Sequence, residues 1–126
     1  MERRYFAEGD VIFNVGDPSS CAYLIVDGTV SILLNEEGGK PEVLASIKPG
    51  EYFGEMGVID NQPRSATAVA EGEVVCFEVS QAEFMDMLVE RPQEAIELLK
   101  LLFQRLRAAN QRLMELGENP RAIARR

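Results

Sequence analysis

The stretch GEMGVIDNQPRSATA, residues 54–68, separates two hydrophobic runs and carries the most distinctive chemistry of the chain. Gly54 and Gly57 allow a backbone to approach a ligand closely, and the residues after Gly54 suit a short helix whose amino end presents free amide protons. Residues 60–63, DNQP, are typical of a turn, which brings the planar guanidinium of Arg64 toward the same point. Amide protons and a guanidinium that converge on one point predict a site for an anion such as phosphate.

Glu55 lies within this cluster, although a carboxylate repels a phosphate at short range. An ionised carboxylate only accepts hydrogen bonds, so it matches a ligand that also presents hydroxyl donors, such as a sugar diol. Glu55 and Arg64 together therefore predict a site for a sugar phosphate.

Short runs rich in β-branched and aromatic residues alternate with turn signals up to about residue 79. Turn signals such as Gly9-Asp10, Asp27-Gly28 and Pro49-Gly50 separate these runs. Short strands at this spacing predict an antiparallel sandwich or barrel, with a jelly roll among the options. The predicted strands cover residues 11–13, 23–26, 29–34, 43–47, 67–70 and 74–79.

From Ser80 onward the hydrophobic pattern becomes helical. The sequence Ser80-Gln81-Ala82-Glu83 fits a capping box, and the helix that it begins is expected to stop near Arg91. Pro92 suits the first turn of a second helix, because its missing amide proton would have no partner there. This second helix is predicted to run to about Leu116, with Gly117 ending it. The expected regions are a β domain over residues 1–90 with its ligand-binding segment at 53–67, a long helix over 91–117, and a flexible tail over 118–126.

The long helix carries residues with the a/d spacing of a coiled-coil seam. A helix that is apolar on more than one side is best explained by packing on its own domain with one face and on a partner helix with another. We therefore expect a homodimer formed through this helix; a single broad core-facing stripe in a monomer is the alternative. The seam residues are Ile96, Leu99, Phe103, Leu106, Asn110 and Leu113, and a second apolar area contains Leu98, Leu101, Leu102, Ala108 and Ala109.

The composition narrows the class of protein. The 126 residues suffice for one compact domain, and the formal net charge of −8 disfavours a surface that binds nucleic acid through many phosphate contacts. No uncharged apolar run is long enough for a membrane span, so we expect a cytoplasmic protein without membrane contact. Cys21 and Cys76 have apolar neighbours and are expected to be free and buried.

The same composition argues against catalysis. The chain contains no histidine and no Cys-x-x-Cys pair, so the usual metal ligands and catalytic bases are missing. No paired acid and base stand out either. We expect neither an enzyme nor a cofactor, although jelly-roll barrels also support metal-dependent chemistry, which leaves an enzyme as a competing hypothesis.

Residues 53–59, FGEMGVI, followed by residues 63–67, PRSAT, resemble the phosphate-binding cassette of cyclic nucleotide-binding domains. These domains occur in regulatory subunits of protein kinases, in gated ion channels and in bacterial catabolite activator proteins. The motifs at residues 9–13, 16–17 and 23–25, together with Gly28, also match the barrel pattern of that family, so the resemblance covers nearly the whole chain. It implies a mainly β fold, namely an antiparallel β jelly-roll barrel that contains a short phosphate-binding helix and is followed by two α-helices.

The resemblance also implies roles for individual residues. Glu55 would accept a hydrogen bond from the ribose 2′-hydroxyl, and Arg64 would pair with the exocyclic oxygens of the cyclic phosphate. Ser65 would add a hydroxyl and a backbone amide, while the amides of Gly54 and Gly57 would complete the anion cradle; position 57 is more often alanine in the family. The predicted ligand-binding residues are Gly54, Glu55, Met56, Gly57, Arg64, Ser65, Ala66 and Asn110.

The nucleotide base needs a wall, which in similar proteins comes from the helix after the barrel. The candidates here are residues near Leu106, Asn110 and Leu113. Asn110 also occupies an a position of the seam, where a polar residue fixes the register of a coiled coil. Its two expected roles, base contact and register, stay open. The small hydroxyl of Ser65 is compatible with adenine and also with guanine, so we expect cAMP as the ligand, with cGMP as the alternative.

The expected function is a regulatory or sensor domain that transmits nucleotide binding through its C-terminal helix. About ten residues follow Leu116, too few for a DNA-reading domain, so this chain is not expected to contact nucleic acid. It is expected to be either a free-standing sensor that acts on an effector protein or the ligand domain of a longer regulator, channel or kinase. A degenerate dimerisation module without a ligand is a further alternative.

Overall fold

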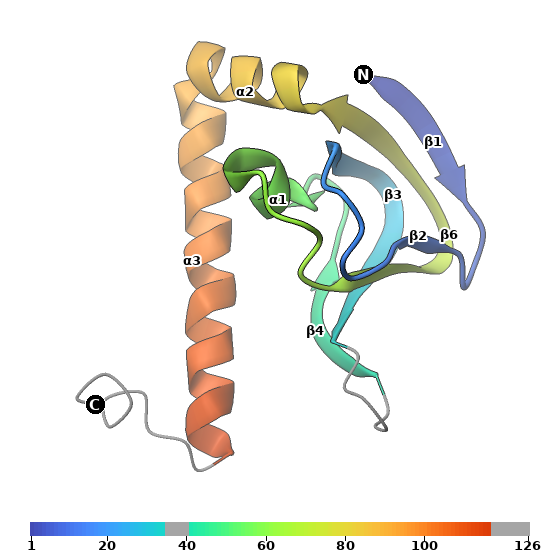
Figure 1. The fold of residues 1–126 in the computed structure, drawn as a ribbon, viewed down its shortest axis with the longest axis vertical. Helices are drawn as coiled ribbons and strands as arrows, with labels where there is room; N and C mark the ends of the chain where they lie inside the picture. Colours follow the sequence, from blue (N-terminus) through green and yellow to red (C-terminus); the bar gives the residue numbers. More distant parts are fainter. Residues whose placement is uncertain (35–40, 117–126) are drawn as a thin grey trace.

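A computed structural model describes residues 1–34 and 41–116 of the chain (Figure 1). The predicted tail, residues 118–126, lies outside the described residues. Within them, no helix combines the length and the apolar character that crossing a membrane requires. The elements are β1 (Glu2–Phe6), β2 (Val11–Phe13), β3 (Cys21–Leu34), β4 (Glu42–Ile47), β5 (Tyr52–Phe53), α1 (Glu55–Asp60), β6 (Thr67–Ser80), α2 (Gln81–Glu90) and α3 (Pro92–Glu115).

The strands form one antiparallel sheet with the order β1-β6-β3-β4, in which β2 also pairs with β6 and β5 pairs with β3. The sheet bends around its core instead of lying flat (Figure 1). Its two longest strands, β3 and β6, pair along their length, from Cys21 opposite Ser80 to Leu33 opposite Thr67. Among the described residues the sheet does not close into a ring, which is consistent with a jelly roll, and the predicted mainly β class is confirmed.

The turn predicted at Asp27-Gly28 is wrong, because the chain does not reverse there. Residues 21–34 form the single strand β3, and the pairing with β6 shifts register on both sides of Asp27. Gly28 has a φ of +93°, and a Cβ atom there would lie 2.3 Å from the carbonyl oxygen of Glu73. Gly28 therefore permits a bulge that bends the strand while its pairing with β6 continues. In the same way, the two strands predicted between residues 67 and 79 form the one strand β6.

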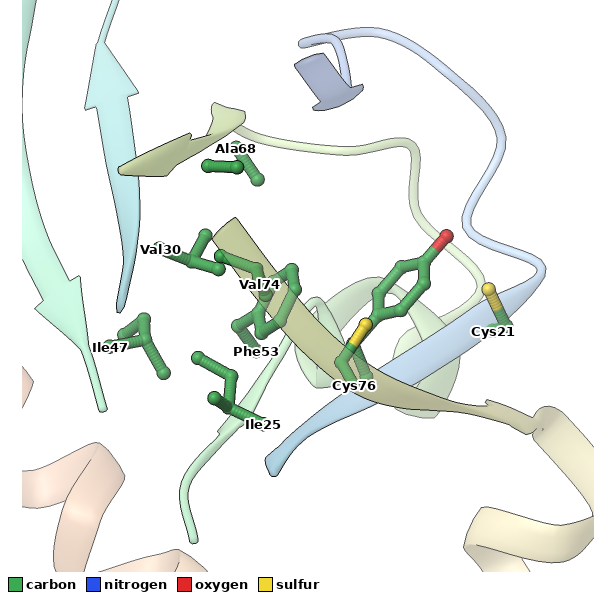
Figure 2. Close-up of a cluster of buried hydrophobic side chains, with 10 residues drawn as sticks. Cys21, Ile25, Val30, Ile47, Phe53, Ala68, Val74 and Cys76 are labelled. Atoms are coloured by element: carbon green, nitrogen blue, oxygen red, sulfur yellow. The ribbon is translucent and has the colours of Figure 1, made fainter. Parts of the chain in front are cut away.

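The concave side of the sheet holds the main hydrophobic core (Figure 2). Ile25, Val30, Ile47, Phe53 and Val74 are almost completely buried and meet there from strands distant in the sequence. Cys21 and Cys76 are free and buried, as predicted. A second cluster forms where α2 and α3 cover the sheet and contains Ala22, Val58, Val79, Phe84 and Leu98. The helices are thus attached to the β domain by an apolar contact that also includes α1.

The two helices begin as predicted. The amide of Glu83 donates to Ser80 Oγ at 3.1 Å, and the amide of Ser80 donates to Glu83 Oε1 at 3.2 Å, so the capping box at the start of α2 is confirmed. α3 begins at Pro92 and continues without interruption to Glu115. It runs along one side of the molecule, past α1 (Figure 1).

The capping box predicts a measurable contribution to stability. Replacing Ser80 with alanine removes the side-chain acceptor for the amide of Glu83, and we expect a loss of about 1 kcal/mol in the free energy of unfolding. Urea denaturation of the Ser80→Ala variant measures this loss. Ser46→Ala, on the exposed face of β4, is the matched control and should change stability by less than about 0.5 kcal/mol. Equal effects of the two substitutions would show that the cap contributes nothing specific.

Candidate functional site

The short helix α1 connects β5 to the turn that precedes β6, and Gly54 is its N-cap. Gly54 has a φ of +74°, and a Cβ atom there would lie 2.6 Å from Arg64 Nη1. Both the backbone conformation and the close approach therefore require glycine. The first amide protons of a helix have no intrahelical partner, and no side chain of residues 1–34 or 41–116 caps those of α1.

Arg64 lies against this helix and is 6% exposed. Its Nη1 donates to the carbonyl oxygen of Gly54 at 2.7 Å, and its Nη2 donates to that of Cys21, also at 2.7 Å. Nε is buried and has no hydrogen-bond partner within the described residues. None of the ion pairs among these residues includes Arg64. Nη2 also lies 3.8 Å from Cys21 Sγ. The guanidinium is thus a buried cation whose hydrogen-bond acceptors are two carbonyl groups and a cysteine sulfur, none of them a carboxylate.

The backbone of Arg64 is fixed by the segment that connects β2 to β3. Its carbonyl oxygen accepts from the amide of Gly16 at 2.8 Å, and its amide donates to the carbonyl oxygen of Asp17 at 2.8 Å. The predicted turn before Arg64 is present: the amide of Gln62 donates to Asp60 Oδ1, and Asn61 adopts a left-handed conformation. These contacts bring the arginine back to the start of α1, as the sequence pattern predicts.

Glu55 is 1% exposed and does not pair with Arg64. Its Oε1 accepts from Arg105 Nη1 at 3.0 Å, while Arg105 Nη2 donates to the carbonyl oxygen of Tyr52 at 2.9 Å. Burial raises the pKa of Glu55, and the positive charge of Arg105 lowers it in part. A carboxylate at the start of α1 is therefore held by an arginine of the long helix α3.

Sequence reasoning missed Arg105. One signal for it exists. Leu98, Leu102 and Arg105 are separated by four and then three residues, which places Arg105 on the side of α3 that packs on the β domain. A charged residue on such a stripe requires an opposite charge or polar partner on the surface that it faces. Glu55 and the carbonyl group of Tyr52 fill this requirement.

The remaining predicted residues lie in different surroundings. Met56 and Ser65 are exposed, whereas Ala66 is buried. A Cβ atom on Gly57 would lie 2.1 Å from Ser19 Oγ and 2.4 Å from the carbonyl oxygen of Gln62, so alanine would not fit at position 57 without a shift. Asn110 is exposed on α3 and forms no hydrogen bond with the cluster around Arg64 in the part of the chain that the structure describes.

A comparison with protein families identifies the family of the chain. The family model described as a cyclic nucleotide-binding domain matches residues 3–91. The chain belongs to the cyclic nucleotide-binding domain family. The match covers the sheet, α1 and α2, and α3 extends beyond it. The resemblance seen in the sequence is thereby confirmed.

Regulatory proteins of this family are similar over most of the chain. The cyclic AMP receptor protein of Thermus thermophilus is 35% identical over 110 residues, which are 87% of this chain and 51% of that protein. The regulatory subunit of a cAMP-dependent protein kinase from Mucor circinelloides is 33% identical over 88 residues, 70% of this chain and 20% of that protein.

A solved structure agrees with both matches. The crystal structure of the Thermus thermophilus catabolite activator protein superposes with a TM-score of 0.80 at 34% identity, covering 92% of this chain and 55% of that one. The chain spans about half the length of its bacterial relatives. The cyclic nucleotide-binding domain thus occurs in them as one part of a longer protein.

The burial of Glu55 predicts a pH dependence of stability. The pKa of Glu55 is raised in the folded protein, so the folded state favours the protonated carboxyl group. The resulting contribution to the free energy of unfolding is fully present below the ordinary pKa of about 4.5, and it is lost as the pH rises through the raised pKa. Glu55→Gln removes this titration. Between pH 4 and 7, the free energy of unfolding of the wild type should therefore fall relative to that of the variant. Urea denaturation across this range measures the difference. The same series with Glu90→Gln, at an exposed position of α2, is the control. If the difference in the free energy of unfolding between the wild type and Glu55→Gln did not change with pH, the prediction would be wrong.

Proposed function

We propose that this cyclic nucleotide-binding domain binds a cyclic purine nucleotide, with cAMP as the preferred ligand and cGMP as the alternative, and that it works as a regulatory sensor. The buried charge of Arg64 carries the proposal. Buried charged groups are normally paired, because removing them from water is costly. Arg64 instead bonds to the carbonyl groups of Gly54 and Cys21, and its Nε has no partner in the described part of the chain. The single negative charge of a cyclic phosphate would supply the missing counter-ion.

The neighbouring groups suit the other parts of such a ligand. The free amides at the start of α1 would add donors to the phosphate oxygens, as would the amide and hydroxyl of Ser65, which follows Arg64 directly. Glu55 would accept from the ribose 2′-hydroxyl, since a carboxylate has about four acceptor positions and Arg105 Nη1 uses one of them. Met56 and Ala66 flank these groups in the sequence and would contribute contacts at the edge of the site.

Arg105 would couple the ligand to α3. Its guanidinium bonds both to Glu55 and to the carbonyl oxygen of Tyr52, so it joins the proposed ribose site to the long helix. A ribose hydroxyl and Arg105 would both donate to the carboxylate of Glu55. The ligand would therefore favour the position of α3 in which Glu55 accepts both hydrogen bonds with good geometry. A ligand shifts such an equilibrium only by its difference in affinity for the two states. The displacement of α3 would be the signal passed to an effector protein or to another part of a longer chain.

The exposed face of α3 supports a homodimer. The five apolar seam residues are between 38% and 58% exposed, although they have the spacing of a coiled-coil interface. Asn110 lies on this seam, where it would meet the partner helix. It would either fix the register of the two helices or reach the nucleotide base bound to the partner. The five residues are Ile96, Leu99, Phe103, Leu106 and Leu113.

Nucleotide titration with an Arg64 variant tests the binding site. We expect cAMP to release or absorb heat in calorimetry and to raise the melting temperature, and Arg64→Ala to weaken binding by roughly 1.5–3 kcal/mol through the loss of a charged hydrogen-bond donor. Arg107→Ala, at an exposed position of α3, keeps the net charge of that variant and should bind as the wild type does. No heat and no thermal shift with either cAMP or cGMP at millimolar concentration would overturn the proposal. Turnover of cAMP by the purified protein would show that it is an enzyme instead.

Sedimentation tests the dimer and separates the two roles of Asn110. Leu106→Glu places a charge in the middle of the proposed interface and should shift the protein from dimer to monomer in analytical ultracentrifugation. If Asn110 sets the register, Asn110→Leu changes the oligomeric state and leaves the preference between cAMP and cGMP unchanged. If Asn110 contacts the base, the same substitution changes that preference. A wild type that sediments as a monomer with and without nucleotide would contradict the proposed dimer.

A further inference from the structure

The guanidinium of Arg64 lies over the face of an aromatic ring. Its central carbon is 4.1 Å from the centroid of the Phe13 ring, which belongs to β2. A second ring, that of Tyr23, is 5.9 Å away. A cation over the face of an aromatic ring is attracted by the quadrupole of the ring, and the attraction increases when water is excluded. Arg64 is buried, so its contact with Phe13 belongs to the stronger class.

The Phe13 ring is itself held in place. It stacks on Tyr23, with 6.2 Å between ring centroids and an interplanar angle of 28°, and on Phe53, with 6.0 Å and 29°. Tyr23 and Phe53 stack on each other at 5.0 Å. β2 is paired with β6, where Phe13 lies opposite Ala68. The ring is therefore fixed by two aromatic neighbours and by the strand that carries it.

Gly54 allows this ring and the arginine to meet. A Cβ atom at Gly54 would lie 3.1 Å from Phe13 Cε2 and 2.6 Å from Arg64 Nη1. The carbonyl groups of Gly54 and Cys21 then hold the two terminal nitrogens of the guanidinium, while the Phe13 ring lies against its central carbon. Gly54, Cys21 and Phe13 thus hold the guanidinium of Arg64, and its Nε has no hydrogen-bond partner among the residues that the structure describes.

We infer that Phe13 is a positioning residue for the phosphate site and acts through its interaction with the Arg64 cation. The inference rests on the proposed function, since it assigns a role within the same site. A free arginine side chain has several rotatable bonds, and ordering it on ligand binding costs entropy. Phe13 orders the guanidinium before the ligand arrives, so the ligand does not have to supply that free energy. The ring therefore raises the affinity for the cyclic phosphate without touching it.

Fluorinated phenylalanines at position 13 test this role. Fluorine withdraws electron density from the ring and weakens its attraction for a cation, while the shape of the side chain changes little and its apolar character is kept. We expect the dissociation constant for cAMP to rise stepwise from Phe through monofluoro- to trifluorophenylalanine, by roughly 3- to 30-fold in total, which corresponds to the range for a cation–π contact. Isothermal titration calorimetry measures each constant.

Phe53 provides a matched control in the same aromatic stack. It is almost completely buried and contacts Phe13 and Tyr23, but it does not lie under Arg64. The same fluorinated residues at position 53 should leave the affinity for cAMP within about twofold of the wild type, because they change the stack without weakening the cation–π contact directly. Phe13→Tyr and Phe13→Leu form a second comparison: the aromatic variant should retain most of the affinity and the aliphatic one should lose it.

The outcomes separate this inference from the proposed function. If the wild type binds neither cAMP nor cGMP, the proposed function fails before Phe13 is tested. If the wild type binds but the constants at position 13 are flat, fall with fluorination, or change as much as those at position 53, the positioning role is wrong. Equal affinities of Phe13→Leu and Phe13→Tyr would also overturn it.

Discussion

The buried positive charge of Arg64 is the constraint around which the site is arranged. Removing a guanidinium from water costs several kcal/mol unless nearby groups compensate. The compensation comes from separate parts of the chain: the carbonyl groups of Gly54 and Cys21 accept its hydrogen bonds, and its central carbon lies over the Phe13 ring. A second pair of contacts, from Gly16 and Asp17, holds its backbone. Because these groups are neutral, they keep the cation in place without cancelling its charge.

The position of α3 explains why Glu55 and Arg64 do not pair with each other. Glu55 and Arg64 lie near each other, and the charge of Arg64 offsets part of the rise in the pKa of Glu55 that burial causes. The two side chains nevertheless do not form an ion pair with each other. Arg105 forms the ion pair with Glu55 instead. If Glu55 paired with Arg64, the site would be internally neutralised and would attract an anion less strongly. Arg105 therefore preserves the attraction of Arg64 for an anion, and it does so from the helix that is proposed to carry the output.

The parts of the fold that could be predicted from the sequence depend on local geometry. The capping box at Ser80 involves residues three apart, and the return of Arg64 toward Gly54 requires only one turn between them. The bulge at Gly28 was mistaken for a chain reversal, because glycine suits both and only the pairing with β6 distinguishes them.

The contacts that were missed join residues about fifty positions apart. Arg105 and Glu55 meet because of the angle at which α3 packs on the domain, and Phe13 reaches Arg64 because β2 pairs with β6. No short motif encodes such contacts. The family resemblance identified Glu55 and Arg64 themselves, but not the residues that hold each of them in position.

The second half of α3 connects the site to the exposed seam. Beyond Arg105 its residues are exposed, and the contact of Arg112 with Glu42 of β4 is an ion pair at the surface, which contributes little to stability. A helical segment of this length is marginal in water by itself, so packing against a partner helix would add the stability that the domain does not provide. Phe103 and Leu106 flank Arg105 in the sequence and belong to that seam. Any rotation of α3 that changes the contact between Arg105 and Glu55 must therefore also turn the seam, which gives the proposed dimer a direct physical link to the proposed nucleotide site.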